Sequence, residues 1–229
     1  MTRIRLYFVC VAVCLAAVPT ATASLLDDLN RDQRQELENG ELIVREQDIP
    51  GKPWPRVRIY KRINAAPEEV AAVFFDYDQA KTYIPDVLES KVSKKISPRV
   101  MEVDYAVDVP ILADEAYTAR NEMMRLGDSY QVSWTLLRAL QTKAAQGNLL
   151  IEPLEKDTSV IRYTNLVTPS SGMAKILGQL AMSRMQKTVL AIGQKVEQQK
   201  SHNPAELAAQ VVRLREALES PAEPDTKNP

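Results

Sequence analysis

The chain has 229 residues, of which 29 are basic and 30 acidic, so its net charge is −1 at pH 7 with histidine neutral. Because no block of like charge stands out, the sequence lacks the basic footprint of a nucleic-acid-binding protein, and we predict no nucleic-acid partner. A chain of this length with 45% hydrophobic residues is long enough for one core plus an appendage.

The first 23 residues are typical of a secretory signal peptide. Two arginines precede an apolar run from Leu6 to Val18, and Ala21-Thr22-Ala23 then forms an A-x-A cleavage site. The apolar run is too short to favour a membrane span. We therefore predict cleavage after Ala23 and an exported protein, either periplasmic or secreted.

Residues 24–55 are predicted to form an N-terminal extension. The pattern indicates a short helix over 24–39, ended by Asn39-Gly40, and a strand over 41–48. Three prolines between residues 50 and 55 exclude a regular element there, because proline cannot donate a hydrogen bond to a strand ladder. Trp54 is interpreted as the anchor of this loop.

Residues 56–200 are predicted to form one α+β domain. Apolar and polar residues alternate over 56–64, which indicates a half-buried strand, and Pro67 suits the first position of a short helix. A second short helix is predicted over 79–83, and residues 143–147 are interpreted as a polar turn. Strands at hairpin spacing, which predict an antiparallel meander, are expected over 87–96, 100–109, 115–125, 129–137, 149–154 and 159–167.

The longest predicted helix runs from Ser171 to Gln199. Its main apolar stripe is small at Ala174, Gly178 and Ala181 and large afterwards, so the first half leaves space beside the helix. A second apolar patch lies only on this first half, at Met173, Ile176, Leu177 and Leu180. Two interpretations remain open: loops cover the patch, or it forms a ligand entrance or a surface that touches a membrane.

Residues 201–219 predict a separate amphipathic helix. Asn203-Pro204-Ala205-Glu206 has the pattern of a capping box, and a narrow leucine and valine stripe follows. The partner of that stripe is either the main domain or another chain, so the oligomeric state stays open. Residues 220–229 are rich in proline and polar residues and are predicted to be disordered.

The sequence excludes several kinds of chemistry. Both cysteines, Cys10 and Cys14, lie in the predicted signal peptide, and His202 is the only histidine. Cysteine or histidine nucleophiles, a Ser-His-Asp triad and a His/Cys zinc site are therefore not expected. No glycine-rich phosphate loop is present. We predict no metal and no cofactor, and we assign no catalytic residue.

Three stretches carry a resemblance to a known superfamily. They are Ile63 to Val70 (INAAPEEV), Phe75-Asp76-Tyr77 and Tyr83 to Val87 (YIPDV). Together with the order of the elements, they resemble the helix-grip fold of the START-like, or SRPBCC, superfamily, which includes lipid-transfer START domains and polyketide cyclases. The resemblance covers about residues 57–196, and the aromatic residue usual after the helix-opening valine is replaced by Ala71-Ala72.

The resemblance implies a curved antiparallel sheet that wraps a long C-terminal helix, with two short helices after the first strand and an apolar cavity between sheet and helix. With the Tyr105 face of its strand turned inward, alternation predicts which other residues share the cavity. The predicted ligand-binding residues, including the patch at the entrance, are Tyr105, Tyr117, Asn121, Tyr130, Trp134, Tyr163, Asn165, Met173, Ile176, Leu177, Leu180 and Ala181. The alternative for each aromatic residue is a position in an ordinary core.

Three functions are compatible with this reading. The first is an exported carrier of a hydrophobic small molecule or lipid held in the cavity. The second is a cyclase- or dehydratase-like enzyme that uses a tyrosine together with an arginine or a carboxylate in the same cavity. The third is a non-enzymatic interaction module of the cell envelope that docks through the helix over 204–219.

Overall fold

The computed structural model describes residues 24–109, 114–170 and 174–220. The predicted signal peptide, the predicted tail from residue 221 onward and Met173 lie outside the described residues. Within the described ranges, no helix combines the length and the apolar character needed to cross a membrane.

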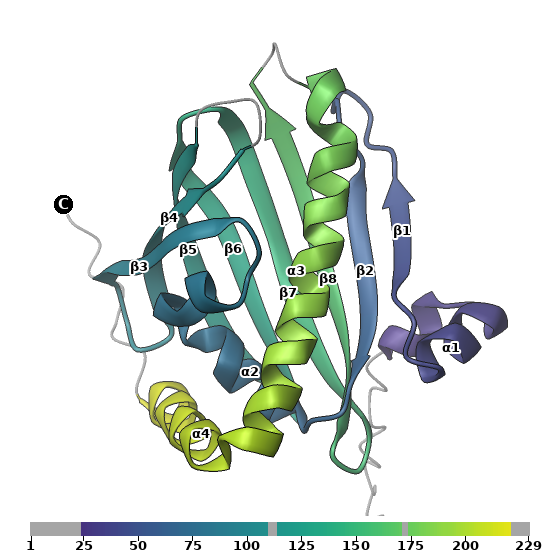
Figure 1. Ribbon diagram of the computed structural model, residues 1–229, viewed down its shortest axis with the longest axis vertical. Helices are drawn as coiled ribbons and strands as arrows, with labels where there is room; N and C mark the ends of the chain where they lie inside the picture. The colour runs from purple at the N-terminus through teal and green to yellow at the C-terminus, as the bar shows by residue number, and fades with distance from the viewer. Residues whose placement is uncertain (1–23, 110–113, 171–173, 221–229) are drawn as a thin grey trace, which may run out of the picture.

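Eight antiparallel strands form one curved sheet with the order β1-β2-β8-β7-β6-β5-β4-β3. At one edge β1 pairs with β2, and β2 pairs with the last strand, β8, while β3 to β8 form the predicted meander (Figure 1). The bounds are β1 Ile43–Gln47, β2 Arg56–Ile63, β3 Val87–Lys95, β4 Val100–Val107, β5 Glu115–Leu126, β6 Ser129–Ala139, β7 Thr142–Glu155 and β8 Thr158–Pro169. The α+β class with a curved antiparallel sheet is confirmed.

One predicted turn is wrong. Residues 143–147 belong to β7, and the chain reverses instead at Leu140 and Gln141. Gly147 in this stretch pairs with Trp134 on β6. This glycine gives the large indole room on the sheet, so it marks a close packing contact rather than a bend.

A long helix, α3 (Ala174–His202), lies across the concave face of the sheet, and two shorter elements follow β2, namely α2 (Pro67–Phe75) and the 3-10 helix η2 (Tyr77–Thr82) (Figure 1). The second half of α3 is anchored by three fully buried residues, Val189, Ile192 and Val196. A Cβ placed on Gly193 would be 3.6 Å from Ile63, so α3 lies close to β2 at this point. The predicted helix-grip arrangement is therefore confirmed.

The N-terminal segment packs against the opposite face of the sheet, at the β1 edge (Figure 1). The single helix predicted over 24–39 is wrong, since the structure has a 3-10 turn, η1 (Leu25–Asp28), and a separate helix, α1 (Arg31–Glu38). Asn30 separates them because its side chain accepts a hydrogen bond from the Gln33 N–H and caps α1. Asp28 fixes the segment to the sheet by accepting hydrogen bonds from Tyr60 (2.9 Å) and Arg162 (2.6 Å).

The last helix, α4 (Pro204–Glu219), packs against α2 in the main domain. Leu207 and Leu214 are buried in the core shared with α2, and Gln210 donates a hydrogen bond to Asp76 at 3.0 Å. The capping box predicted at Asn203 is wrong. The Asn203 side chain makes no capping hydrogen bond, because the residue continues α3 through its backbone N–H, which donates to Gln199 O.

An ion pair between α2 and α4 predicts how stability depends on pH. Arg215 donates to Glu68 through Nε at 2.7 Å, and this hydrogen bond lowers the pKa of the Glu68 carboxyl below its ordinary 4.5. A lowered pKa in the folded state means that the stabilisation is present above the ordinary pKa and is lost as the pH falls through the folded value. We expect Glu68→Gln to reduce the loss of stability on acidification.

Urea unfolding of the wild type and of Glu68→Gln across the acidic range measures this effect. Glu89→Gln is the matched control, because Glu89 is an exposed carboxylate on β3. Equal sensitivity to acid in the wild type and in Glu68→Gln would show that the ion pair does not contribute.

Candidate functional site

A cavity of about 340 Å³ lies between the concave face of the sheet and the first half of α3. One face of the helix lines this cavity. Its lining residues follow one another at intervals of three, one, three, one and three positions, as expected for a single helical stripe. These helical positions are Leu177, Leu180, Ala181, Arg184, Met185 and Thr188. The cavity ends where the larger residues of α3, beginning with Val189, pack directly against the sheet.

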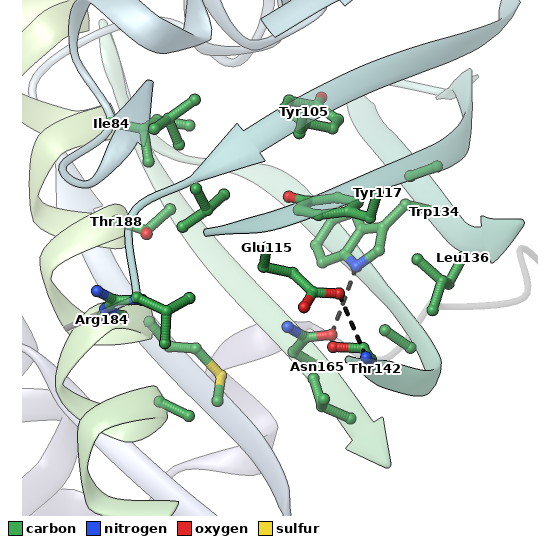
Figure 2. A pocket seen from close by; sticks show the side chains of 18 of the residues that line it. Ile84, Tyr105, Glu115, Tyr117, Trp134, Leu136, Thr142, Asn165, Arg184 and Thr188 are labelled. Carbon is green, nitrogen blue, oxygen red and sulfur yellow. Dashed lines mark hydrogen bonds between the residues drawn. The ribbon is translucent and has the colours of Figure 1, made fainter. Parts of the chain in front are cut away.

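Aromatic side chains form the wall opposite the helix. Tyr105 and Tyr117 stack with their ring centroids 5.0 Å apart, and Trp134 and Tyr163 pack at the same distance with a tilt of 32°. Trp134 also donates a hydrogen bond from Nε1 to the Asn165 side chain at 3.4 Å (Figure 2). The wall is rigid and mostly apolar, with its few polar atoms held in place, as small-molecule pockets require.

The tyrosines of the wall are held in the neutral form. Burial raises the pKa of Tyr105, Tyr117 and Tyr163 well above the ordinary value of 10. A neutral phenol is a hydrogen-bond donor and acceptor, whereas a tyrosine that removes protons needs a lowered pKa. These residues are therefore suited to positioning a ligand and poorly suited to acting as a base.

Glu115, at the start of β5, places a carboxylate in the cavity wall (Figure 2). Only 9% of the residue is exposed, and its oxygens accept backbone hydrogen bonds from Gln141 at 3.0 Å and from Thr142 at 3.2 Å. The carboxylate thus closes the β6–β7 turn and satisfies backbone donors. Its hydrogen-bonding capacity is largely used inside the protein.

Arg184 brings a positive charge to the α3 side of the cavity, across from Tyr117 and Trp134 (Figure 2). Its Nε lies 3.1 Å from Asp86 Oδ2, and 18% of its side chain is exposed. Asp86 is held in the left-handed region with a φ of 65°, which aspartate tolerates better than most residues. The pair joins α3 to the loop that leads into β3.

Nine of the twelve predicted site residues line the cavity: Tyr105, Tyr117, Asn121, Trp134, Tyr163, Asn165, Leu177, Leu180 and Ala181. Tyr130 does not line it, because the first part of β6 runs beneath α2, where the Tyr130 hydroxyl donates to Glu68 at 3.3 Å. Ile176 lies within α3, and Met173 lies outside the described residues. That these residues bind a ligand remains a prediction.

Sequence reasoning missed three chemically informative members of the cavity, Trp54, Glu115 and Arg184. Arg184 follows Leu180 and Ala181 by four and three residues, so helical spacing alone places it on the same face. Glu115 precedes Tyr117 by two residues, so strand alternation could have found it. Trp54 could not be found in this way, because it reaches the cavity from a proline-rich loop that has no periodicity.

Three solved structures illustrate the similarity of the fold. The STAR-related lipid transfer protein from Xanthomonas axonopodis matches with a TM-score of 0.62 and 17% identity, over 69% of this chain and 94% of that one. The Zhui aromatase/cyclase from Streptomyces sp. R1128 matches with a TM-score of 0.58 and 13% identity, over 64% and 96%. Human STARD10 matches with a TM-score of 0.56 and 17% identity, over 76% and 82%.

No protein-family model matches the sequence, and no curated protein matches it. The structural similarity nevertheless covers most of both chains in each of these pairs. The chain therefore has the START-like, or SRPBCC, helix-grip fold, as the sequence resemblance predicted. Within the described residues, no group of three histidine, cysteine or carboxylate side chains is placed to hold a metal ion.

Proposed function

We propose that this START-like chain is an exported carrier that holds a hydrophobic small molecule or lipid between the sheet and α3. The observation that supports the proposal most directly is the cavity of about 340 Å³ with its apolar, aromatic wall. Transfer of a hydrocarbon chain from water into such a space is worth about 0.8 kcal/mol per methylene. The described residues supply binding surface and no free catalytic base.

Exposed leucines near the cavity suggest where the ligand enters. Leu137 and Leu140 are 44% and 71% exposed at the end of β6. Gln141 and Thr142, which directly follow Leu140, line the cavity and are hydrogen-bonded to Glu115, so Leu140 lies beside its rim. Apolar side chains in this position are suited to contact with a membrane surface. In the proposed cycle, the carrier collects or delivers its ligand with this rim against the membrane.

Native mass spectrometry of the protein purified from the periplasm of an expressing bacterium, with organic extraction of bound material, tests the carrier. We expect a stoichiometric complex with a lipid-like molecule, because an apolar cavity of this size gains free energy when it is filled. A ligand-free mass that is unchanged after incubation with envelope lipids would contradict the proposal. A mass that retains residues 1–23 would contradict the predicted cleavage after Ala23.

The two other functions receive less support from the described residues. An enzyme of the cyclase or dehydratase type needs a free acid–base pair, but burial keeps the cavity tyrosines neutral and Glu115 is bonded to backbone amides. An interaction module that docks through α4 needs a free apolar stripe, but Leu207 and Leu214 are buried within the chain. Both features favour the carrier.

A further inference from the structure

The Arg184 guanidinium has unused hydrogen-bonding capacity in an unusual place. Its Nε and Nη2 atoms are buried, and neither has a hydrogen-bond acceptor among the described residues. The approach of Nε to Asp86 at 3.1 Å is an ion pair without the direction of a hydrogen bond. Buried hydrogen-bond donors without acceptors are costly, so these two nitrogens mark a place where a partner is expected.

The surroundings limit what that partner can be. The groups nearest along the same helical stripe are Ala181, Met185 and Thr188, so the guanidinium stands in a mostly apolar lining. Arg184 lines the cavity, so a molecule bound there can supply an acceptor that the described residues do not. Arginine matches the planar, two-oxygen geometry of a carboxylate better than it matches a neutral acceptor.

We propose that the ligand is an amphiphile with a carboxylate head, and that Arg184 binds this head while the aromatic wall holds the apolar tail. This inference rests on the proposed carrier function and adds the chemical class of its ligand. Asp86 takes up part of the arginine charge in the structure, so a head with a single negative charge suits the site better than a doubly charged one.

A second charge in the cavity fixes the direction in which the ligand lies. The Glu115 carboxylate lines the sheet side of the same cavity and repels an anionic head. The head therefore lies at α3, next to Arg184 and the Thr188 hydroxyl (Figure 2). The tail then lies toward Trp134 and Tyr163, whose rings pack 5.0 Å apart.

Paired ligands that differ only in the head test the inference. Dodecanoate, dodecanol and dodecylamine are titrated into the full-length mature protein by calorimetry, at a pH where dodecanoate is ionised. We expect the wild type to bind dodecanoate at least about tenfold more tightly than dodecanol, since a charge-assisted hydrogen bond is worth about 1.5 kcal/mol or more. Arg184→Gln should remove this preference and leave dodecanol binding nearly unchanged, which also shows that the variant is folded.

Two further variants sharpen the test. Arg184→Lys should retain part of the preference, because the charge remains but the two-pronged geometry is lost. Asp86→Asn should strengthen dodecanoate binding, because it removes the carboxylate that competes for Arg184.

Each contrary outcome has its own meaning. Equal binding of dodecanoate and dodecanol by the wild type would overturn the role of Arg184 and leave the carrier function intact. A preference for dodecylamine would overturn it as well, and would identify Asp86 or Glu115 as the group that binds the head. Failure of the wild type to bind any of the three ligands would count against both the carrier function and this inference.

Discussion

Replacing Ala181 with tryptophan should abolish ligand uptake while the protein stays folded. Ala181 lines the cavity from the middle of the α3 stripe, between Leu180 and Arg184. An indole at this position extends across the space that the ligand tail needs. If it excludes about four methylenes, each worth about 0.8 kcal/mol, affinity falls by roughly two orders of magnitude.

The measurement is a dodecanoate titration of the wild type and of Ala181→Trp, together with urea unfolding of each. Ser183→Trp is the matched control, because Ser183 is exposed on the same helix two residues further on. We expect the control to bind like the wild type. Unchanged binding in a folded Ala181→Trp protein would show that the ligand is not held in this cavity.

Replacing Gly147 with alanine should destabilise the fold by about 3 kcal/mol or more. A Cβ built on Gly147 lies 2.3 Å from the backbone oxygen of Thr164 on β8 and 2.5 Å from the Trp134 ring on β6. The backbone oxygen cannot move aside without disturbing the β7–β8 ladder. The strands must therefore separate, and Trp134 must leave its place in the cavity wall.

Urea unfolding followed by circular dichroism measures this loss, and a dodecanoate titration measures the accompanying change at the cavity. Gly178→Ala is the control, because a Cβ at Gly178 meets its nearest neighbour, Trp54 Nε1, at an ordinary 3.5 Å. Alanine is favoured over glycine in a helix by about 1 kcal/mol, so this variant should be at least as stable as the wild type. A wild-type unfolding midpoint for Gly147→Ala would show that the strands relax more easily than the structure implies.

The order and type of the elements could be predicted from the sequence because each rests on a local signal. The alternation of apolar and polar residues predicted the strands between Arg56 and Val167. The proline at residue 67 predicted the start of α2, where the Ala66 N–H donates to Glu69 at 2.8 Å. Alternation also placed Tyr105, Tyr117 and Tyr163 at one wall of the cavity. Periodicity can be read from the sequence alone, so these elements could be predicted without knowledge of tertiary contacts.

The errors occur where a tertiary contact outweighs a local preference. Gly147 looks like a turn residue, but the indole of Trp134 above it requires a glycine in a strand. Arg184 looks like a surface charge on a helix, but it pairs with Asp86 on the loop before β3 and lines the cavity. None of these partners is close in sequence.

The pairing of β2 with β8 also has a consequence for the order in which the protein can fold. Val57 pairs with Asn165, so strands about a hundred residues apart in sequence must meet before β1 and β2 can join the rest of the sheet. Until β8 has emerged, β2 has only β1 as a neighbour, and a two-stranded ribbon is marginal in water. The chain therefore cannot close its core during synthesis of its first half.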